Sequence, residues 1–393
     1  MEYIKLGDIC EIKSSKRIYQ SDYVDNGVPF YRGKEISELS RNEDIETELY
    51  ITEEKYKELN EKFGSVQKGD LLITSVGTIG NTWVSDGRKL YYKDGNITQI
   101  VNNDKINTKY ISYLFKSNLI KRQYLKGTSG TAQVALTIEK LKNITIPKLS
   151  IDEQNKIVEV LDKAQSLIDK KREQIELLDE LVKSRFIEMF GDPVNNPKSF
   201  EILTIGDLTT DVKYGTSKSS SDGGKYPYLR MNNITYDGKL DLNDLKYIDI
   251  DDNELEKYIV KKGDVLFNRT NSIELIGKTC VFELDEPMII AGYIIRVRLK
   301  NNILPIYLST FLNSSYGKTL LRGMAKGAVN QANINAQELK SIKVHVPPIE
   351  LQNEFAEFVT KIDSIRSKME ASLSELEDNF NSLMQKAFKG ELF

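Results

Sequence analysis

The chain is poor in the residues that most metal centres and many active sites need. Among its 393 residues there are one histidine and two cysteines. Cys10 and Cys280 lie in different halves without metal-ligand spacing, so the sequence indicates neither a disulfide framework nor a zinc site, and reduced thiols are expected. The single histidine, His345, lies in an alternating run beside valines, where we expect a structural or exposed role rather than catalysis.

Long apolar runs are also missing. The longest, from Met288 to Ile295, is much shorter than the roughly 20 residues that span a bilayer. The N-terminus lacks the charged and apolar regions of a signal peptide. We therefore expect a soluble, cytoplasmic protein with no membrane partner.

The common nucleotide-binding and catalytic motifs are absent. There is no P-loop and no G-x-G-x-x-G, and the tripeptide at 192–194 (DPV) is not the Asp/Asn-Pro-Pro-aromatic motif with which an amino-methyltransferase grips a flipped base. Carboxylates are plentiful, but no pair stands out by its spacing. The sequence predicts no catalytic residues and no metal ligands.

The strongest pattern present is a heptad seam that occurs twice. From Ile157 to Met189 the seam positions recur at alternating steps of four and three residues, with Lys171 and Arg185 as polar interruptions. Adding 198 to each number gives a second seam, from Phe355 to Ala387. Any long amphipathic helix shows one seam because of core packing. The repetition in the same register instead favours two long helices that pack on each other.

The regions around the seams are duplicated as well, with a period of about 200 residues. Both helix entries, 149–155 and 347–353, place a glutamine in the first turn, and both globular parts contain a Lys-Gly-Asp turn. Gly191 and two prolines mark a linker that ends the first helix. We predict five segments: a mixed α/β domain (1–150), a long helix (151–190), a linker (191–199), a second mixed α/β domain (200–348) and a second long helix (349–393).

Within each domain the order of expected elements is the same. After the Lys-Gly-Asp turn come β-rich runs, at 71–74 and 83–84 in one half and at 265–267 and 289–297 in the other. A basic helix follows, at 109–125 or 306–324. A last strand, at 144–147 or 342–347, leads into the long helix. The fold class is therefore α+β.

The net charge is −3, but acidic and basic residues are unevenly distributed along the chain. The two helix segments together carry −7, which leaves +4 for the rest of the chain. Residues 105–148 hold nine basic residues and one acidic residue, and residues 287–348 hold eight and one. A basic section at the end of each domain is compatible with binding nucleic acid.

Two small-residue stretches follow the basic helices: GTSGTAQ at 127–133 and GAVNQAN at 327–333. Small residues let backbone N–H groups approach an anion, and Gln or Asn can pair with an adenine edge. A plain turn is the alternative interpretation of each stretch.

Two basic α/β domains, each followed by a long seam-bearing helix with Leu-Ser or Pro-Pro and then a glutamine at its entry, resemble the specificity (S) subunit of type I restriction–modification systems. The resemblance covers essentially the whole chain, including the FKGEL stretch at 388–392. It implies two target-recognition domains held by an antiparallel coiled coil of the long helices. Each domain would read one half of a bipartite site in double-stranded DNA.

The resemblance also implies the partners. Two methyltransferase (M) subunits that modify adenine would dock on the helices and adjoining surfaces, and restriction (R) subunits would complete the assembly. No cofactor is expected on this chain, because S-adenosylmethionine, ATP and Mg would belong to the partner subunits. The chain itself is expected to be non-catalytic.

Candidate DNA-binding residues follow from side-chain chemistry. Arginine suits guanine and amides suit adenine, so base contacts are predicted for Arg32, Lys34, Thr128, Ser129 and Gln133 in the first domain, and for Arg230, Asn232, Asn233, Asn330, Gln331 and Asn333 in the second. Basic residues on or beside the helices are predicted to contact phosphate: Lys116, Lys121, Arg122, Lys126, Lys318, Arg322 and Lys326. An ordinary surface role is the alternative for each of them.

Two other functions stay open at this point. One is a non-catalytic coiled-coil scaffold for protein interactions, which a salt-dependent DNA-binding assay would distinguish. The other is an enzyme with an unrecognised site, such as a nuclease or a fused methyltransferase, which the missing motifs disfavour.

Overall fold

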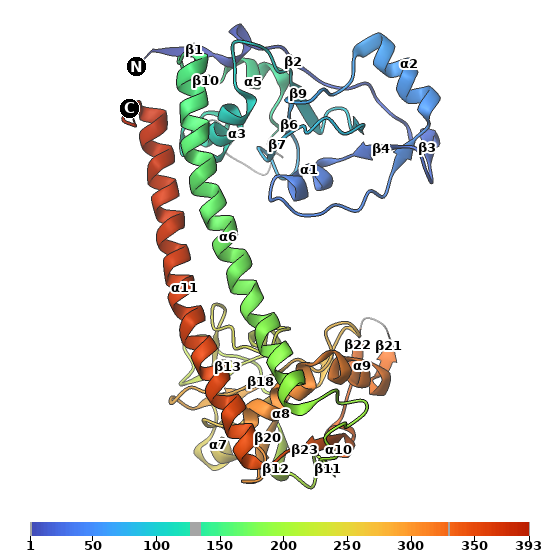
Figure 1. Cartoon of the computed structure of the whole chain (residues 1–393), viewed down its shortest axis with the longest axis vertical. Helices are drawn as coiled ribbons and strands as arrows, with labels where there is room; N and C mark the ends of the chain where they lie inside the picture. The colour runs from blue at the N-terminus through green and yellow to red at the C-terminus, as the bar shows by residue number, and fades with distance from the viewer. Residues whose placement is uncertain (1, 126–134, 329–330, 393) are drawn as a thin grey trace. The chain divides into compact units, whose positions relative to one another are not determined.

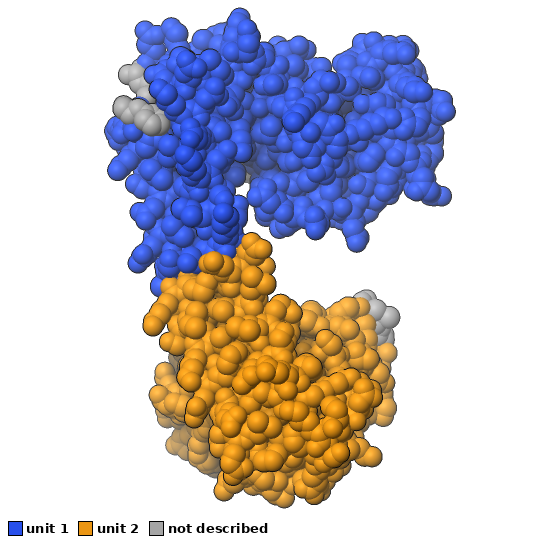
Figure 2. Space-filling view, viewed as in Figure 1, with its two compact units in different colours: residues 1–172, 371–393 blue, residues 173–370 orange. Residues whose placement is uncertain are grey.

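The computed structural model describes residues 2–125, 135–328 and 331–392 (Figure 1). Its internal contacts divide the chain into two units (Figure 2). Unit 1 comprises Met1–Arg172 and Ala371–Phe393, and unit 2 comprises Glu173–Glu370. Each unit therefore contains one globular domain together with a part of both long helices.

The two long helices are α6 (Ile151–Phe190) and α11 (Ile349–Lys389). The first heptad seam, at 157–189, lies within α6, and the second, at 355–387, lies within α11. Helix α6 stops because Gly191 adopts a left-handed conformation, with φ of +80°, while its N–H still donates to Ile187 O at 2.8 Å.

The helices pack in antiparallel fashion within each unit, which confirms the predicted fold class. In unit 1 the beginning of α6, with Ile157 and Leu161 buried, packs against the end of α11, where Phe380 and Met384 are buried. In unit 2 the end of α6 around Phe186 packs against the beginning of α11. Both long helices therefore contribute side chains to the hydrophobic core of each unit.

The globular domain of unit 1 contains two four-stranded sheets. The first is antiparallel, in the order β2 (Ile12–Lys13), β9 (Ile97–Ile100), β6 (Leu71–Thr74) and β7 (Thr82–Val84). The second has the order β3 (Tyr23–Val24), β5 (Tyr50–Ile51), β4 (Val28–Tyr31) and β8 (Tyr91–Tyr92), and β4 and β8 are parallel. The pair β1 (Tyr3–Lys5) and β10 (Thr145–Pro147) leads into α6. The helices of this domain are α1 (Gly33–Leu39), α2 (Glu53–Phe63), α3 (Thr108–Lys116), α4 (Asn118–Leu125) and α5 (Ile138–Asn143).

Unit 2 has the same antiparallel sheet, whereas its second sheet differs in the place of one outer strand. Its antiparallel sheet has the order β12 (Thr209–Tyr214), β20 (Ile294–Leu299), β16 (Val265–Asn268) and β18 (Thr279–Val281). Its second sheet has the order β14 (Lys246–Ile248), β13 (Tyr226–Leu229), β19 (Met288–Ile290) and β15 (Ile259–Val260), with β13 and β19 parallel. The pair β11 (Glu201–Thr204) and β23 (Lys343–Val346) leads into α11. The helices are α7 (Asp252–Tyr258), α8 (Pro305–Asn313), α9 (Ser315–Met324) and α10 (Ala336–Ser341).

Unit 2 also has a small sheet beside the sequence GAVNQAN. Its order is β17 (Thr270–Asn271), β22 (Gln331–Asn333) and β21 (Lys326–Ala328). The described parts of this stretch are thus strands. Elsewhere in the domain, a 3-10 turn (Met231–Asn233) follows β13.

The two basic helices predicted at 109–125 and 306–324 are each broken in two, and the prediction of a single helix was wrong. Ser117 ends α3 with ψ of 155°, and its Oγ donates to Leu114 O at 2.6 Å. Ser314 has ψ of 160° and accepts from Gly317 N at 3.1 Å, which caps α9. Serine can satisfy backbone groups outside a helix, so both serines end one helix and begin the next.

The glutamines at the helix entries join each long helix to its domain. Gln154 is 3% exposed, accepts from Asn107 N at 2.9 Å and donates to Leu149 O at 3.1 Å. Gln352 is 0% exposed, accepts from Leu304 N at 2.8 Å and donates to Pro347 O at 2.8 Å. This shared bonding accounts for the glutamine in both entry sequences.

Among the described residues, neither α6 nor α11 nor any shorter helix combines the length and the apolar character needed to cross a membrane.

Candidate nucleic-acid interface

Two predicted base-contacting arginines occupy equivalent places in the two domains. Arg32 follows β4 and Arg230 follows β13. In each case the side chain three residues ahead accepts the arginine backbone N–H: Glu35 Oε2 at 2.7 Å from Arg32 N, and Asn233 Oδ1 at 2.9 Å from Arg230 N. The duplicated backbone therefore presents an arginine at the same strand end in both units.

Both guanidinium groups are engaged by carboxylates in this structure. Arg32 bonds Glu35 at 2.8 Å and Glu48 at 2.7 Å, while Lys34 bonds the other oxygen of Glu48 at 2.7 Å. Hydrogen bonds from Lys34 and Arg32 lower the pKa of Glu48 to about 2. If Arg32 or Lys34 contacts DNA, that side chain must therefore either divide its donors between DNA and Glu48 or break its bond to Glu48.

The corresponding arginine of unit 2 is held by a single acidic residue. Arg230 donates to Asp244 Oδ2 at 2.7 Å and to its carbonyl oxygen at 2.8 Å. Asn232 is exposed beside it. Asn233 is only 2% exposed, and its Nδ2 donates to Asp241 O at 2.7 Å, so both ends of its amide hold the loop together. We assign Asn233 to the scaffold and leave Arg230 and Asn232 as candidates for base contact.

The structure brings the basic helix α9 against this loop. Arg322 donates to the Tyr236 hydroxyl at 2.9 Å, and the Lys318 ammonium lies 4.8 Å from the centre of the Tyr236 ring. Lys278, which the sequence reasoning missed, donates to Met231 O at 2.8 Å. Predicted phosphate contacts and predicted base contacts thus meet at one surface of unit 2.

Lys318 differs from the exposed phosphate contact that we expected. It is 6% exposed, and its Nζ donates to Gly277 O at 3.3 Å. Burial, and next the charges of Arg322 and Lys278, lower the pKa of Lys318 to about 8. Any effect of its charge on a ligand at the surface is therefore exerted from a buried position.

The small sheet of unit 2 carries a second group of candidates. Asn333 Oδ1 accepts from Arg269 at 3.0 Å, and the Arg269 guanidinium lies 4.8 Å from the centre of the Tyr214 ring. Gln331 is exposed on the same strand, and Lys326 forms an ion pair with Glu338 at 2.6 Å. Asn330 lies outside the described residues.

In unit 1 the predicted phosphate contacts are distributed over α3 and α4. Lys121 and Arg122 are exposed, and neither forms an ion pair with another residue that the structure describes. The Lys116 ammonium lies 5.5 Å from the centre of the Tyr113 ring. Lys126, Thr128, Ser129 and Gln133 lie outside the described residues.

Three residues of this surface were missed by the sequence reasoning: Tyr236, Arg269 and Lys278. Arg269 lies two residues after the β-rich run expected at 265–267, whereas Lys278 and Tyr236 lie outside every element that we expected. Their partners lie 64, 47 and 86 residues away for Arg269, Lys278 and Tyr236, respectively. No local sequence pattern could have shown that these residues lie beside those partners.

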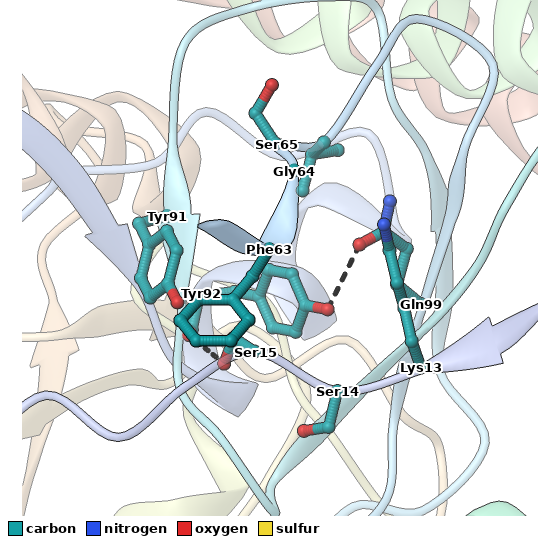
Figure 3. A pocket seen from close by; sticks show the side chains of 10 residues that line it. Lys13, Ser14, Ser15, Phe63, Gly64, Ser65, Tyr91, Tyr92 and Gln99 are labelled. Atoms are coloured by element: carbon teal, nitrogen blue, oxygen red, sulfur yellow. Dashed lines mark hydrogen bonds between the residues drawn. The ribbon is translucent and has the colours of Figure 1, made fainter. Parts of the chain in front are cut away.

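A pocket lies in the domain of unit 1 (Figure 3). It has about 270 Å³ of space, open solvent included. The Tyr92 hydroxyl donates to Gln99 Oε1 at 3.0 Å, and the Ser15 hydroxyl donates to Tyr92 O at 2.6 Å. Burial raises the pKa of Tyr92, so this phenol stays protonated. The pocket presents hydrogen-bonding groups but no nucleophile paired with a base.

The remaining titratable candidates include the two cysteines and the histidine. Within the described residues no group of three or more His, Cys, Asp or Glu is placed to hold a metal ion. Burial raises the pKa of Cys10 and of Cys280 to about 12, which suits inert thiols. Partial burial lowers the pKa of His345.

Comparisons with known proteins, by family model and by sequence, indicate the same family. A protein-family model described as "Type I restriction modification DNA specificity domain" matches residues 1–177 and 197–378. The type I restriction enzyme EcoKI specificity subunit of Escherichia coli (strain K12) is 25% identical over 303 residues, which are 72% of this chain and 65% of that protein. The putative type I restriction enzyme MjaX specificity subunit of Methanocaldococcus jannaschii is 31% identical over 202 residues, which are 50% of this chain and 47% of that protein. The matches thus span roughly half to two-thirds of these relatives.

The fold is shared with a solved structure as well. A chain from work on complex assembly and conformational transition of the type I R-M system has a TM-score of 0.62 at 16% identity. The match covers 100% of this chain and 98% of that chain. Because the family model matches both halves of the duplication, the chain belongs to the type I restriction modification DNA specificity domain family.

Proposed function

We propose that this chain is the sequence-specific DNA-binding subunit of a type I restriction–modification complex. Each globular domain reads one half of a bipartite site in double-stranded DNA. The observation that carries the proposal is the arginine at the end of β4 and of β13, which the duplicated fold presents twice with different neighbours, Glu35 and Glu48 in one unit and Asn233 and Asp244 in the other. A common scaffold with divergent polar residues suits two different half-sites.

The proposed subunit is non-catalytic and acts through partners in the cytoplasm. Two methyltransferase subunits bind to it, and restriction subunits complete the complex. S-adenosylmethionine, ATP and Mg are bound by those partners and not by this chain.

The proposal is tested by exchanging a domain. Residues 1–150 are replaced by the equivalent domain of a homologue, and the modified adenines are mapped with the methyltransferase subunits present. We expect one half-site to change and the other to stay, because each domain carries its own polar surface. A simultaneous change of both half-sites would contradict independent reading.

The alternative function, a non-catalytic coiled-coil scaffold for protein interactions, predicts a different behaviour of the isolated chain. A DNA-reading subunit must bind DNA with a steep dependence on salt concentration, because its cations displace counterions from the phosphates. A scaffold would show no such dependence. Binding titrations at several salt concentrations therefore separate the two functions.

A further inference from the structure

The cluster of Lys278, Lys318, Arg322 and Tyr236 in unit 2 has an excess of positive charge. Lys278 is 8% exposed and Lys318 is 6% exposed. Each ammonium donates to a backbone carbonyl, Met231 O at 2.8 Å and Gly277 O at 3.3 Å. No carboxylate among the described residues forms an ion pair with Lys278, Lys318 or Arg322.

This situation costs stability unless an anion compensates for it. A buried charge is unfavourable without a paired opposite charge, because the low-dielectric interior replaces its hydration poorly. Asp237 is the carboxylate whose charge acts on Lys318, and it forms its own ion pair with Lys239 at 3.0 Å. Three cations therefore share at most part of one negative charge.

The geometry offers an entry for an anion. Arg322 is exposed, and Tyr236 is 44% exposed. The guanidinium has five N–H donors, and its Nη2 donates to the Tyr236 hydroxyl at 2.9 Å. An anion that approaches here meets Arg322 and the Tyr236 hydroxyl first. The ammonium groups of Lys318 and Lys278 lie behind them and add positive potential.

The cluster is connected to the candidate base-reading loop. Lys278 donates to Met231 O, the carbonyl between Arg230 and Asn232. Asn268 Nδ2 approaches the same carbonyl at 3.5 Å. An anion bound beside Lys278 would thus be held at a fixed position relative to Arg230 and Asn232.

The equivalent place in unit 1 lacks this charge. Asn81 precedes β7 as Lys278 precedes β18, and its Nδ2 donates to Ser37 Oγ at 3.0 Å. Lys121 follows Ser117 by the same four residues that separate Lys318 from Ser314, but Lys121 is exposed. The buried pair of lysines is therefore a feature of the second domain within the described chain.

We propose that Lys278, Lys318, Arg322 and Tyr236 form a binding site for one phosphate group of the DNA backbone, which anchors the Arg230–Asn233 loop over its half-site. The inference rests on the proposed DNA-reading function. It assigns to Arg322 and Tyr236 the direct contacts, and to Lys318 and Lys278 the positive field behind them. Phosphate is the anion that suits this group because it accepts several hydrogen bonds at once.

The first experiment uses inorganic phosphate as the probe and does not depend on DNA. Thermal unfolding of the purified full chain at pH 7 is compared in phosphate and in chloride at equal ionic strength. We expect phosphate to raise Tm, because an anion bound only to the folded state stabilises it. Lys318→Met should have a higher Tm than the parent in chloride and should lose most of the phosphate increment.

The matched control is Lys262→Ala, which removes one exposed lysine that pairs with Asp285 at 2.8 Å, away from the cluster. It should retain the phosphate increment. An equal increment in the parent, in Lys318→Met and in Lys262→Ala would overturn the site, because phosphate would then act without the buried lysines.

The pH dependence follows from the lowered pKa of Lys318, about 8 in the fold. The groups that face it are Lys278, Arg322, Asp237 and Tyr236. Below pH 8 both the folded and the unfolded chain carry the proton, so the cost of the buried charge is fully present. The Tm advantage of Lys318→Met should shrink as the pH rises above 8. An advantage that does not change with pH would show that the gain comes from packing alone and would contradict the charge argument.

The second experiment assigns the phosphate to DNA. Arg322→Ala should weaken binding to all sequences and reduce the salt slope of log affinity by about one, with the preferred half-site unchanged. An unchanged slope, with the phosphate increment in Tm still present in the parent, would place a free-anion site here and overturn the DNA contact. If the parent chain itself bound no DNA, the proposed function would fail while the Tm result would still decide the anion site.

Discussion

At the scale of single residues, the glutamines of the helix entries show how one side chain can join two elements. Gln352 accepts from Leu304 N and donates to Pro347 O at 2.8 Å and to Asn302 O at 3.2 Å. It thereby ties the segment before α8 to the end of β23 and to the first turn of α11. Gln154 repeats these bonds in unit 1, with Asn107 in the place of Leu304.

Replacing this glutamine by an apolar residue of similar size should destabilise the domain. Gln352→Leu leaves buried backbone groups without partners, so we expect the free energy of unfolding to fall by about 2–4 kcal/mol, at roughly 1–3 kcal/mol for each unsatisfied group. Urea denaturation of the full chain measures this change. The exposed neighbour Asn353 provides the control, and Asn353→Ala should change the stability by less than about 0.5 kcal/mol. A similar, small effect of both variants would show that the three bonds contribute little.

The arginines at the strand ends illustrate what duplication preserves and what it changes. The backbone bond to the residue three positions ahead is kept at Arg32 and Arg230, although the acceptor is a carboxylate in one and an amide in the other. The acids that hold the guanidinium groups, Glu48 and Asp244, lie at different separations along the chain. The position is thus structural, whereas its electrostatic surroundings are free to diverge between half-sites.

At the scale of elements, α6 and α11 differ in the middle of their seams. Arg366 occupies a seam position of α11 and is 7% exposed, while the equivalent position of α6, Ile168, is 2% exposed and apolar. Arg366 donates to Asp179 of α6 at 2.5 Å and to Ile175 O at 3.3 Å. A buried polar residue at a seam position favours one alignment of the helices over others, because a shift would leave its charge unpaired.

Removing one partner of this pair should cost more than removing both. We expect Arg366→Ala to lower the free energy of unfolding by roughly 1–3 kcal/mol, because Asp179 loses a partner in a half-buried place. The double variant Arg366→Ile with Asp179→Ala should recover much of that loss, since isoleucine reproduces the apolar packing at Ile168. Chemical denaturation of the two variants and of Asp179→Ala alone completes the cycle. Additive losses would contradict a direct coupling between the two side chains.

The broken helices belong to this scale as well. Ser117 and Ser314 separate α3 from α4 and α8 from α9, so that α4 and α9 begin with their own first turns. In unit 2 this break precedes the helix that carries Lys318 and Arg322. The basic helix α9 is thereby a separate element from the apolar helix α8, which is buried in the core.

At the scale of the whole molecule, each long helix belongs to both units, because the boundaries fall after Arg172 in α6 and after Glu370 in α11. Both helices are continuous across these boundaries. Antiparallel packing occurs in each unit, with the beginning of one helix against the end of the other. Lengthening both helices by a whole heptad at these points should therefore preserve both packed ends.

Such an insertion tests whether the helices set the distance between half-sites. Seven residues added after Arg172 and seven after Glu370 lengthen each helix by about 10 Å, at 1.5 Å per residue. At roughly 3.4 Å per base pair, the preferred DNA spacer should grow by about three base pairs, with the half-site sequences unchanged. Mapping of methylated adenines measures the spacer. A stable, active insertion variant that kept the original spacer would show that the helices do not set it.

The sequence by itself determined the repeated architecture. The heptad seam at 157–189 predicted a long helix, and its repetition 198 residues later predicted a second helix of the same kind. The Lys-Gly-Asp turns and β-rich runs located the central strands β6 and β16. These features are local or periodic, so residues close together in the chain are sufficient to specify them.

Only the tertiary structure decided which candidate residues come together and which are buried. Lys318 looks like any exposed helix lysine in the sequence, yet the fold places it under Tyr236 and beside the connection that carries Lys278. Asn233 looks like a base-reading amide, yet both ends of its side chain hold the backbone. The physical reason is that burial and ion pairing are properties of neighbours in space, and those neighbours come from strands and loops distant in the chain.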